Sequence, residues 1–196
     1  MTFWNWRRGA GTSATSGTAA VALATELAPI ELYTADSRIV AWIAASGRRV
    51  TDLLNQESEL RLWRPSPGPL EAPSAPASTS DAPPANPETG GEWQSLGTDR
   101  VILAMPPEWR ASRQLRLHRR LRRVAVLAGP FSVTGNLHLV PGAEPGPDFL
   151  HRAPHFLPLT DAYILHSGEP PFEHVVSVVI VNTAHVVQLQ PLVSLA

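Results

Sequence analysis

Ten short segments of this chain alternate apolar and polar residues with a period of two or run apolar, and both patterns predict β-strands. These segments are separated by short stretches of Gly, Pro, Asp and Ser, which favour turns. They are "IELYT", "RIVAWIAA", "ELRLW" and "RVILAMPP" in the N-terminal half and "VAVLAG", "FSVTGNLHLV", "HFLPL", "AYILH", "VVSVVIVN" and "HVVQLQPLV" in the C-terminal half. The predicted fold class is therefore mainly β.

Three segments do not follow either pattern. "RRVTDLLNQ" predicts a single helical turn in which Thr51 or Asp52 is the cap and two leucines form an apolar step. Residues 1–28 are small and polar over most of their length, which predicts a flexible arm. Residues 64–96 are rich in Pro, Ala and Ser, and proline can neither donate to a strand ladder nor continue a helix. They predict a disordered insert.

The two halves share one order of elements. Residues 30–45 match residues 124–139, which lie 94 positions later, and residues 51–63 match residues 147–159, which lie 96 positions later. "VILAMPPEW" matches "VVIVNTAHV", which begins 77 positions later. This recurring order of strand, strand, Asp-headed turn, strand, loop and strand indicates a tandem duplication.

Each copy is expected to be a small β-barrel or curled sheet of the SH3-like or Sm-like kind. Modules of this size bury little surface alone, so two are expected to pack together, share a core and cover each other's strand edges. The predicted units are a flexible arm (1–28), a first β-module (29–109) that contains the insert (64–96), an Arg-rich linker (110–123) and a second β-module (124–196).

Three segments of the second half, "FSVTGNLHLVPG", "PHFLPLTDA" and "VVIVNTAHVV", carry a resemblance. They resemble a small, functionally uncharacterised bacterial β-domain family in which an arginine–apolar strand, an "SDLLN"-like turn, "FLPLTDA" and "VNxxHI" recur. "VTDLLNQ" is similar to the second of those elements. The resemblance covers about a third of the chain. It implies a bacterial β-domain and no particular activity.

Charge is polarised along the chain. The formal net charge is −1, and all 16 basic residues are arginine. Seven of the arginines fall in one stretch without any acid, which leaves 9 arginines against 17 acids elsewhere. The seven are Arg110, Arg113, Arg116, Arg119, Arg120, Arg122 and Arg123.

This Arg-rich segment has three readings, and its pattern leaves helix and strand open. It is a solvated face or a protective strand edge, a patch for an acidic protein partner or for the acidic remainder of this chain, or a footprint for nucleic acid phosphates. No groove-reading motif and no interleaved aromatic residues accompany it. The residues predicted here to bind a partner are Arg116, Arg119, Arg120, Arg122 and Arg123.

The tip of the N-terminal arm is a second candidate contact. Trp4, Trp6, Arg7 and Arg8 stand in an otherwise small and polar segment. Such residues fold back onto the domain, dock on a partner protein or lie at a lipid interface. Among these we predict binding to a protein partner.

The chain offers little evidence of catalytic or metal chemistry. Asp148, His151 and His155 are residue types that bind metals, but Pro154 interrupts the helix that would place both imidazoles on one face. No HExxH, GxSxG or phosphate-loop motif occurs, and the chain has no cysteine. We therefore predict no catalytic residue, no metal and no other cofactor.

Three other polar residues are expected to have structural roles. His138 and His185 lie within strand patterns and are expected to be half-buried, each making a hydrogen bond. Asp161 follows Thr160 in "LPLTDA", and such a pair is expected to organise a turn.

These observations predict an intracellular bacterial protein that acts as a non-catalytic structural or adaptor subunit and binds a protein partner. No apolar run approaches the ~20 residues of a membrane span, and the N-terminus lacks the charge order of a secretory signal, so we expect a cytoplasmic protein. The first alternative is binding of nucleic acid through residues 110–123. The second is a metal-dependent enzyme centred on Asp148, His151 and His155. The oligomeric state is left open.

Overall fold

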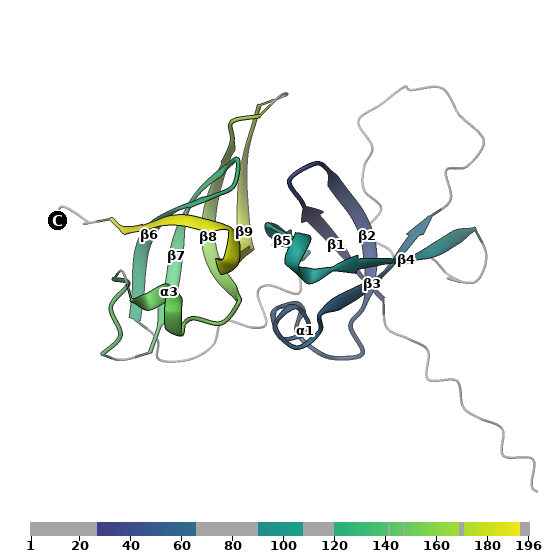
Figure 1. The fold of residues 1–196 in the computed structure, drawn as a ribbon, viewed down its shortest axis with the longest axis horizontal. Helices are drawn as coiled ribbons and strands as arrows, with labels where there is room; N and C mark the ends of the chain where they lie inside the picture. Colours follow the sequence, from purple (N-terminus) through teal and green to yellow (C-terminus); the bar gives the residue numbers. More distant parts are fainter. Residues whose placement is uncertain are drawn as a thin grey trace, which may run out of the picture.

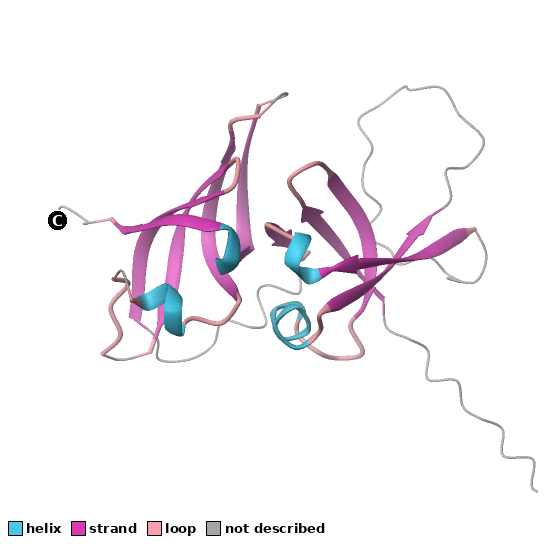
Figure 2. Ribbon diagram, in the orientation of Figure 1, coloured by secondary structure: helices cyan, strands magenta, loops and turns pink. Residues whose placement is uncertain are grey.

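A computed structural model of the chain describes residues 27–65, 90–107, 120–140, 142–146, 148–168 and 171–192. Its ten strands form one antiparallel sheet in the order β10-β6-β7-β8-β9-β5-β1-β2-β3-β4. Helices among these residues are short (Figures 1 and 2). The predicted fold class, mainly β, is confirmed.

The sheet has an N-terminal and a C-terminal unit of five strands each, which lie side by side in Figure 1. The N-terminal unit comprises β1 (Leu27–Tyr33), β2 (Arg38–Ala44), α1 (Val50–Gln56), β3 (Glu59–Pro65), β4 (Gly91–Gly97), the 3₁₀ turn η1 (Thr98–Arg100) and β5 (Leu103–Met105). The C-terminal unit comprises β6 (Arg120–Ala128), β7 (Phe131–Leu139), α3 (Phe149–Arg152), β8 (Phe156–His166), β9 (Phe172–Asn182), the 3₁₀ turn η2 (Thr183–His185) and β10 (Val186–Pro191).

The two units have the same strand order, β5-β1-β2-β3-β4 and β10-β6-β7-β8-β9. A helix follows the second strand in each unit, and a 3₁₀ turn follows the fourth. Each residue of an N-terminal strand has a counterpart in the C-terminal unit a fixed number of positions later. This offset is 94 positions for the first two strands, 97 for the third and 85 for the last two. With these offsets, the cross-strand pairs that both units form coincide. The correspondence therefore extends from the order of the strands to their register.

The register corrects two offsets of the sequence alignment. The offset of 94 agrees with the ladders, but the offset of 96 is wrong by one in the third strand, because three residues separate α3 from β8 whereas two separate α1 from β3. The offset of 77 is wrong because η1 and β5 correspond to η2 and β10, and not to β9.

Several predicted boundaries also differ from the structure. β1 begins at Leu27, inside the range assigned to the arm. β4 lies inside the predicted insert 64–96, and the segment 66–89 lies outside the described residues. β6 begins at Arg120, so the last four residues of the predicted linker form a strand. These four residues are exposed, which explains why three of them are arginine.

The helices differ from expectation at their starts. α1 begins at Val50 after Arg49, and no side chain caps it, so the prediction of Thr51 or Asp52 as the cap is wrong. The helix starts early because Val50 is buried together with Leu53 and Leu54. In the C-terminal unit, the Asp-headed turn of the predicted order is the short helix α3, which follows Asp148 and contains His151.

Each unit surrounds a hydrophobic core, and the two end strands of its five-stranded sheet both contribute side chains to that core. In the N-terminal unit, Leu96 of β4 and Ala104 of β5 belong to one buried cluster. In the C-terminal unit, Val179 of β9 belongs to a second cluster against which Leu189 of β10 packs. Since the end strands meet around one core, each five-stranded sheet is curled.

β5 and the end of β9 form a wall between the two cores. Leu103 lies opposite Val181, and Ala104 lies opposite Ile180. Successive side chains of a strand point to opposite faces, so Ile180 packs in the first core and Val181 in the second. We call this strand pair the shared wall, and because of it neither core is complete without residues of the other unit.

The shared wall predicts that the two units unfold together. Ile180→Ala removes buried methyl groups from the wall and is expected to lower the free energy of unfolding by about 2–5 kcal/mol. The matched control Val175→Ala changes the same strand where the side chain is 75% exposed, and its expected effect is below about 0.5 kcal/mol. Denaturant unfolding is monitored by far-ultraviolet circular dichroism and by tryptophan fluorescence, since every tryptophan precedes residue 110. Two separate transitions in the unmodified chain would contradict the shared wall.

Candidate functional site: the cleft between the two units

The hairpin tips of the two units face each other across a cleft. The tip of the β1–β2 hairpin is a tight turn, in which the Thr34 hydroxyl oxygen accepts hydrogen bonds from the backbone N–H groups of Asp36 (3.3 Å) and Ser37 (3.1 Å). On the other side, the Ser167 backbone N–H donates to the Pro130 carbonyl (3.1 Å) and joins the β8–β9 hairpin to the β6–β7 turn. Both sides of the cleft are therefore held by local hydrogen bonds.

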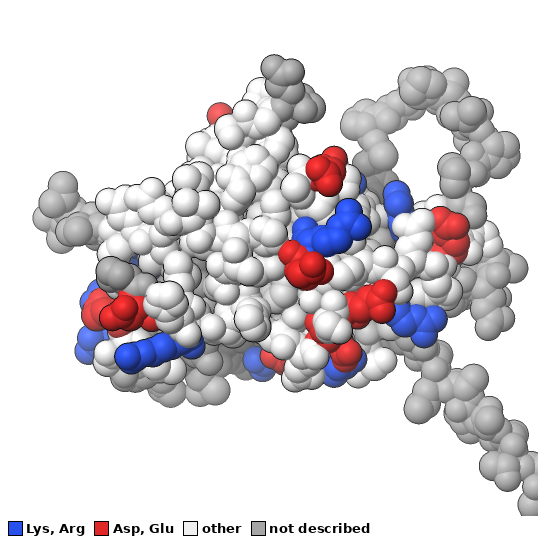
Figure 3. Space-filling view, viewed as in Figure 1, with Lys and Arg blue, Asp and Glu red and all other residues white. Residues whose placement is uncertain are grey.

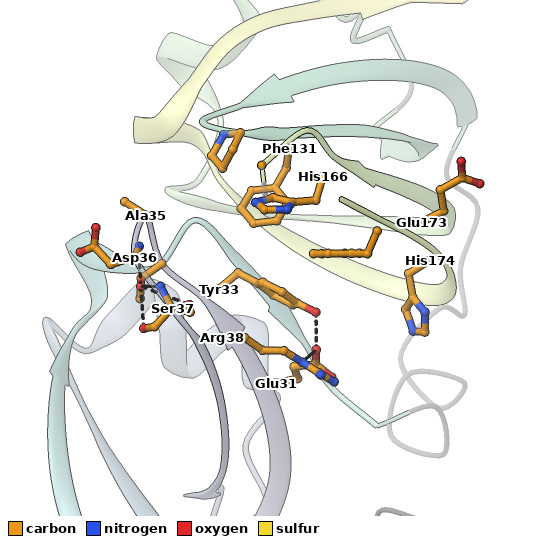
Figure 4. A pocket seen from close by; sticks show the side chains of 14 residues that line it. Glu31, Tyr33, Ala35, Asp36, Ser37, Arg38, Phe131, His166, Glu173 and His174 are labelled. Atoms are coloured by element: carbon orange, nitrogen blue, oxygen red, sulfur yellow. Dashed lines mark hydrogen bonds and ion pairs between the residues drawn. The ribbon is translucent and has the colours of Figure 1, made fainter. Parts of the chain in front are cut away.

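The cleft has a volume of about 660 Å³, and each unit supplies half of the residues that line it (Figure 4). We call it the seam cleft. Its N-terminal side consists of Glu31, Tyr33, Thr34, Ala35, Asp36, Ser37 and Arg38. Its C-terminal side consists of Pro130, Phe131, His166, Gly168, Phe172, Glu173 and His174.

Four rings form a continuous aromatic cluster in the seam cleft. The ring centroids of Tyr33 and Phe131 are 5.3 Å apart in an edge-on arrangement, and those of Phe131 and His166 are 4.8 Å apart. The His166 ring stacks on Phe172 with centroids 4.9 Å apart. Such contacts stabilise the site beyond the burial of their apolar area, and they connect the two units directly.

A charged group lies beside the aromatic cluster. The Tyr33 hydroxyl and the Arg38 guanidinium both donate to the same carboxylate oxygen of Glu31 (Figure 4). Burial raises the pKa of Tyr33 far above its ordinary value, and the hydrogen bond to Glu31 raises it further. The bond to Glu31 also raises the pKa of Arg38. Tyr33 therefore remains protonated at neutral pH and acts as a donor.

Charged side chains are unevenly distributed over the surface. In Figure 3, acidic and basic side chains alternate along the boundary between the two units and over the N-terminal unit, whereas much of the C-terminal unit in this view carries no charge. The seam cleft thus combines an aromatic lining with a charged margin. Concave sites with this composition bind ligands or protein side chains.

The predicted arginine site is only partly within the described residues. Arg120, Arg122 and Arg123 lie on β6, which resolves this part of the segment as strand. Arg122 pairs with Glu144 (3.1 Å), and this hydrogen bond lowers the pKa of Glu144. Arg123 donates to the backbone carbonyl of Asp161 (3.0 Å). Trp4, Trp6, Arg7, Arg8, Arg116 and Arg119 lie outside the described residues.

Asp161 differs from its predicted role. It lies within β8 at a bulge, with a positive φ of 48°, and not in a turn between strands. The bulge is opposite Gly135, where an added Cβ would lie 3.0 Å from the Cβ of Leu159. The Asn136 amide donates to the Asp161 carboxylate (3.0 Å) and holds the bulge. The prediction of a turn is wrong because the local polar signal of a bulge is the same.

The histidines that the structure describes show no arrangement typical of a metal centre. His138 shares a hydrogen bond with the Thr160 hydroxyl (2.9 Å), and His185 shares one with the Asp99 carbonyl (2.7 Å). Both are half-buried, as expected. Within the described part of the chain, no three His, Cys, Asp or Glu side chains are placed to hold a metal ion, and this includes Asp148, His151 and His155.

The sequence did not reveal the seam cleft. Its lining comes from three separate segments of the chain, within residues 31–38, 130–131 and 166–174, and no local sequence pattern connects them. The signal that the sequence did contain was the matching position of the β1–β2 and β6–β7 turns in the two units.

The chain was compared with family models, curated proteins and solved structures, and none of them matches it. Among the described helices, none has the length and apolar character that crossing a membrane requires. The resemblance to a bacterial β-domain family remains a prediction.

The hydrogen bonds of the two tyrosines predict an alkaline titration. Burial and a hydrogen bond to Glu31 raise the pKa of Tyr33, and a hydrogen bond to Glu173 raises the pKa of Tyr163, so neither tyrosine of the folded chain is expected to ionise near pH 10, the ordinary value. Because the unfolded chain loses these protons first, stability is retained below about pH 10 and falls as the pH rises further.

Phenolate absorbance of the folded and the denatured protein measures this titration. Glu31→Gln should lower the pKa of Tyr33, and Glu173→Gln is the matched change for Tyr163. The interpretation fails if a phenolate forms near pH 10 in the folded chain.

Proposed function

We propose that this chain is a non-catalytic binding protein made of two fused copies of one small β-module, and that it holds a protein partner in the seam cleft. The observation that carries the proposal is the cleft itself, because the β1–β2 hairpin of one unit forms one side, and the β6–β7 turn and the β8–β9 hairpin of the other unit form the opposite side. The complete site requires both modules, since one module alone supplies half of it.

Duplication of an SH3-like or Sm-like module is supported by hydrogen bonds that recur at corresponding positions. The Thr98 hydroxyl donates to the Ser58 carbonyl (3.1 Å), and the Thr183 hydroxyl donates to the His155 carbonyl (3.1 Å). The backbone N–H of each threonine donates to the same carbonyl, at 3.0 and 2.7 Å. Both pairs obey the offsets of 85 and 97, which favours duplication over chance resemblance between two β-rich segments.

A protein segment is the occupant that suits the seam cleft. Its aromatic cluster offers a surface for an apolar or aromatic side chain, and Phe172 and His166 are only half-buried. Arg38, Asp36 and His174 line the margin, where they can bind backbone or charged groups. Partner side chains that anchor interfaces are commonly aromatic residues and arginine within such a polar margin.

The arm and the arginines remain part of this proposal as further contacts. Trp4, Trp6, Arg7 and Arg8 have the composition of interface anchors. The alternative of nucleic acid binding has less support, because Arg122 is paired with Glu144 and Arg123 is bonded to the chain's own backbone. No observation favours the alternative of a metal-dependent enzyme.

Matched charge reversals test the seam cleft. Arg38→Glu reverses a half-exposed charge in the cleft, and Arg48→Glu reverses a comparable charge that is paired with Glu57 outside it. A protein captured from cells by the unmodified chain is purified, and its affinity for each variant is measured. Arg38→Glu is expected to weaken binding at least about tenfold, which corresponds to about 1.4 kcal/mol, whereas Arg48→Glu should change it little.

Equal affinity of both variants for the captured protein would contradict the cleft as the binding site. Retention of the chain on heparin that disappears when Arg120, Arg122 and Arg123 are replaced by serine would instead favour nucleic acid.

A further inference from the structure

The strand pairing that joins the two units, which we call the junction, has counterparts in the two end strands of the sheet. In the junction, β5 of the N-terminal unit pairs with β9 of the C-terminal unit. By the offset of 85, β10 corresponds to β5, and β4 corresponds to β9. β10 and β4 are the two end strands of the sheet, and within the described residues each has a neighbour on one side only.

Exposed apolar side chains lie on both end strands. Val187 of β10 is 77% exposed, whereas Ile102, at the corresponding position of the junction, is buried. Trp93 of β4 is 41% exposed, whereas the corresponding Val178 is buried. A strand edge with exposed apolar residues is a site for pairing with another strand. β10 carries no charged residue that would oppose this.

Charges at corresponding positions are complementary between the two ends. Inside the chain, the Asn55 side chain of α1 bonds both backbone groups of Phe156. The residues that correspond to Asn55 at the end of α3 are His151 and Arg152, and the residue that corresponds to Phe156 is Glu59. If a second copy of the chain were placed as the two units are placed at the junction, the basic residues of α3 in one copy would lie near the exposed Glu59 carboxylate of the other.

A second pair of corresponding groups is also complementary. In the junction, the His185 ring bonds the backbone carbonyl of Asp99. Their counterparts are Arg100 and Ala184, so the Arg100 guanidinium, which is a donor, would face the Ala184 carbonyl, which is an acceptor. The ends of the chain therefore repeat the junction with groups that can pair.

We infer that copies of this chain associate head to tail, with β10 of one copy pairing antiparallel to β4 of the next. The inference rests on the correspondence of the two units under "Proposed function" and is independent of the seam cleft. The register follows from the junction: Gln188 lies opposite Leu96, and Leu189 lies opposite Ser95. Contacts of this kind are heterologous, and they close into rings or continue as filaments.

The end strands are more polar than the strands of the junction. Gln188 and Gln190 occupy the positions of Leu103 and Met105, and Ser95 occupies the position of Ile180. Association through β10 and β4 is therefore held mainly by the backbone ladder and by the charge pairs. It is weaker than the internal junction and depends on protein concentration.

Because the chain has no cysteine, single cysteines test the register directly. Gln190 and Gln94 are opposite each other in the inferred ladder, and opposite Cβ atoms are within reach of a disulfide. Chains with Gln190→Cys are mixed with chains that carry Gln94→Cys, and the mixture is oxidised. In the matched control, the second chain carries Glu92→Cys, which lies two positions away on the same face of the strand. The in-register mixture is expected to form the mixed dimer at least tenfold faster than the control.

Equal crosslinking rates, or a mass that stays monomeric in light scattering at every concentration, would overturn the inference. A charge exchange gives a second readout: Glu59→Arg should weaken association, and mixing it with chains that carry Arg152→Glu should restore the contact between those two. The seam-cleft variant Arg38→Glu should associate like the unmodified chain. Failure of partner binding with intact association would thus reject only the proposed function.

Discussion

The pairing of β5 with the end of β9 is the interaction on which the rest of the structure depends. Both strands are buried on both faces, and the wall they form contributes side chains to two cores at once. Fully burying one such aliphatic side chain contributes about 1.5–3 kcal/mol. The wall therefore stabilises each unit through the other, and a small module that would be marginal alone becomes part of a larger core.

Asn182 fixes where this wall ends. Its buried amide donates to the Val101 carbonyl (2.8 Å), and its side-chain oxygen accepts from the Ala184 backbone N–H (3.0 Å). Its own backbone N–H donates to the Ile102 carbonyl (2.9 Å). These bonds satisfy polar groups that would otherwise be buried without partners, and a shift of one residue would break them together. The relative position of the two units, and with it the seam cleft, follows from this register.

The sequence predicted those features that depend on local periodicity. It gave the β class, the apolar run "VILAM" as a strand and the correspondence of the first two strands of each unit. It did not predict which edges pair, because the apolar pattern of β5 and β9 indicates burial but not the partner. The start of α1 at Val50 was missed because tertiary packing decides it, and the bulge at Asp161 was missed because its local polar residues also suit a turn. The seam cleft could not be predicted because its sides meet only after β5 and β9 pair.

Native-state hydrogen exchange measures the shared wall most directly. If the two units share one cooperative core, the backbone N–H of Asn182 and those of the ladder between β5 and β9 exchange only through global unfolding, with the same free energy as the slowest amides of β2 and β7. The account would be contradicted if the amides of the wall exchanged through a smaller opening while the interior strands of both units stayed protected.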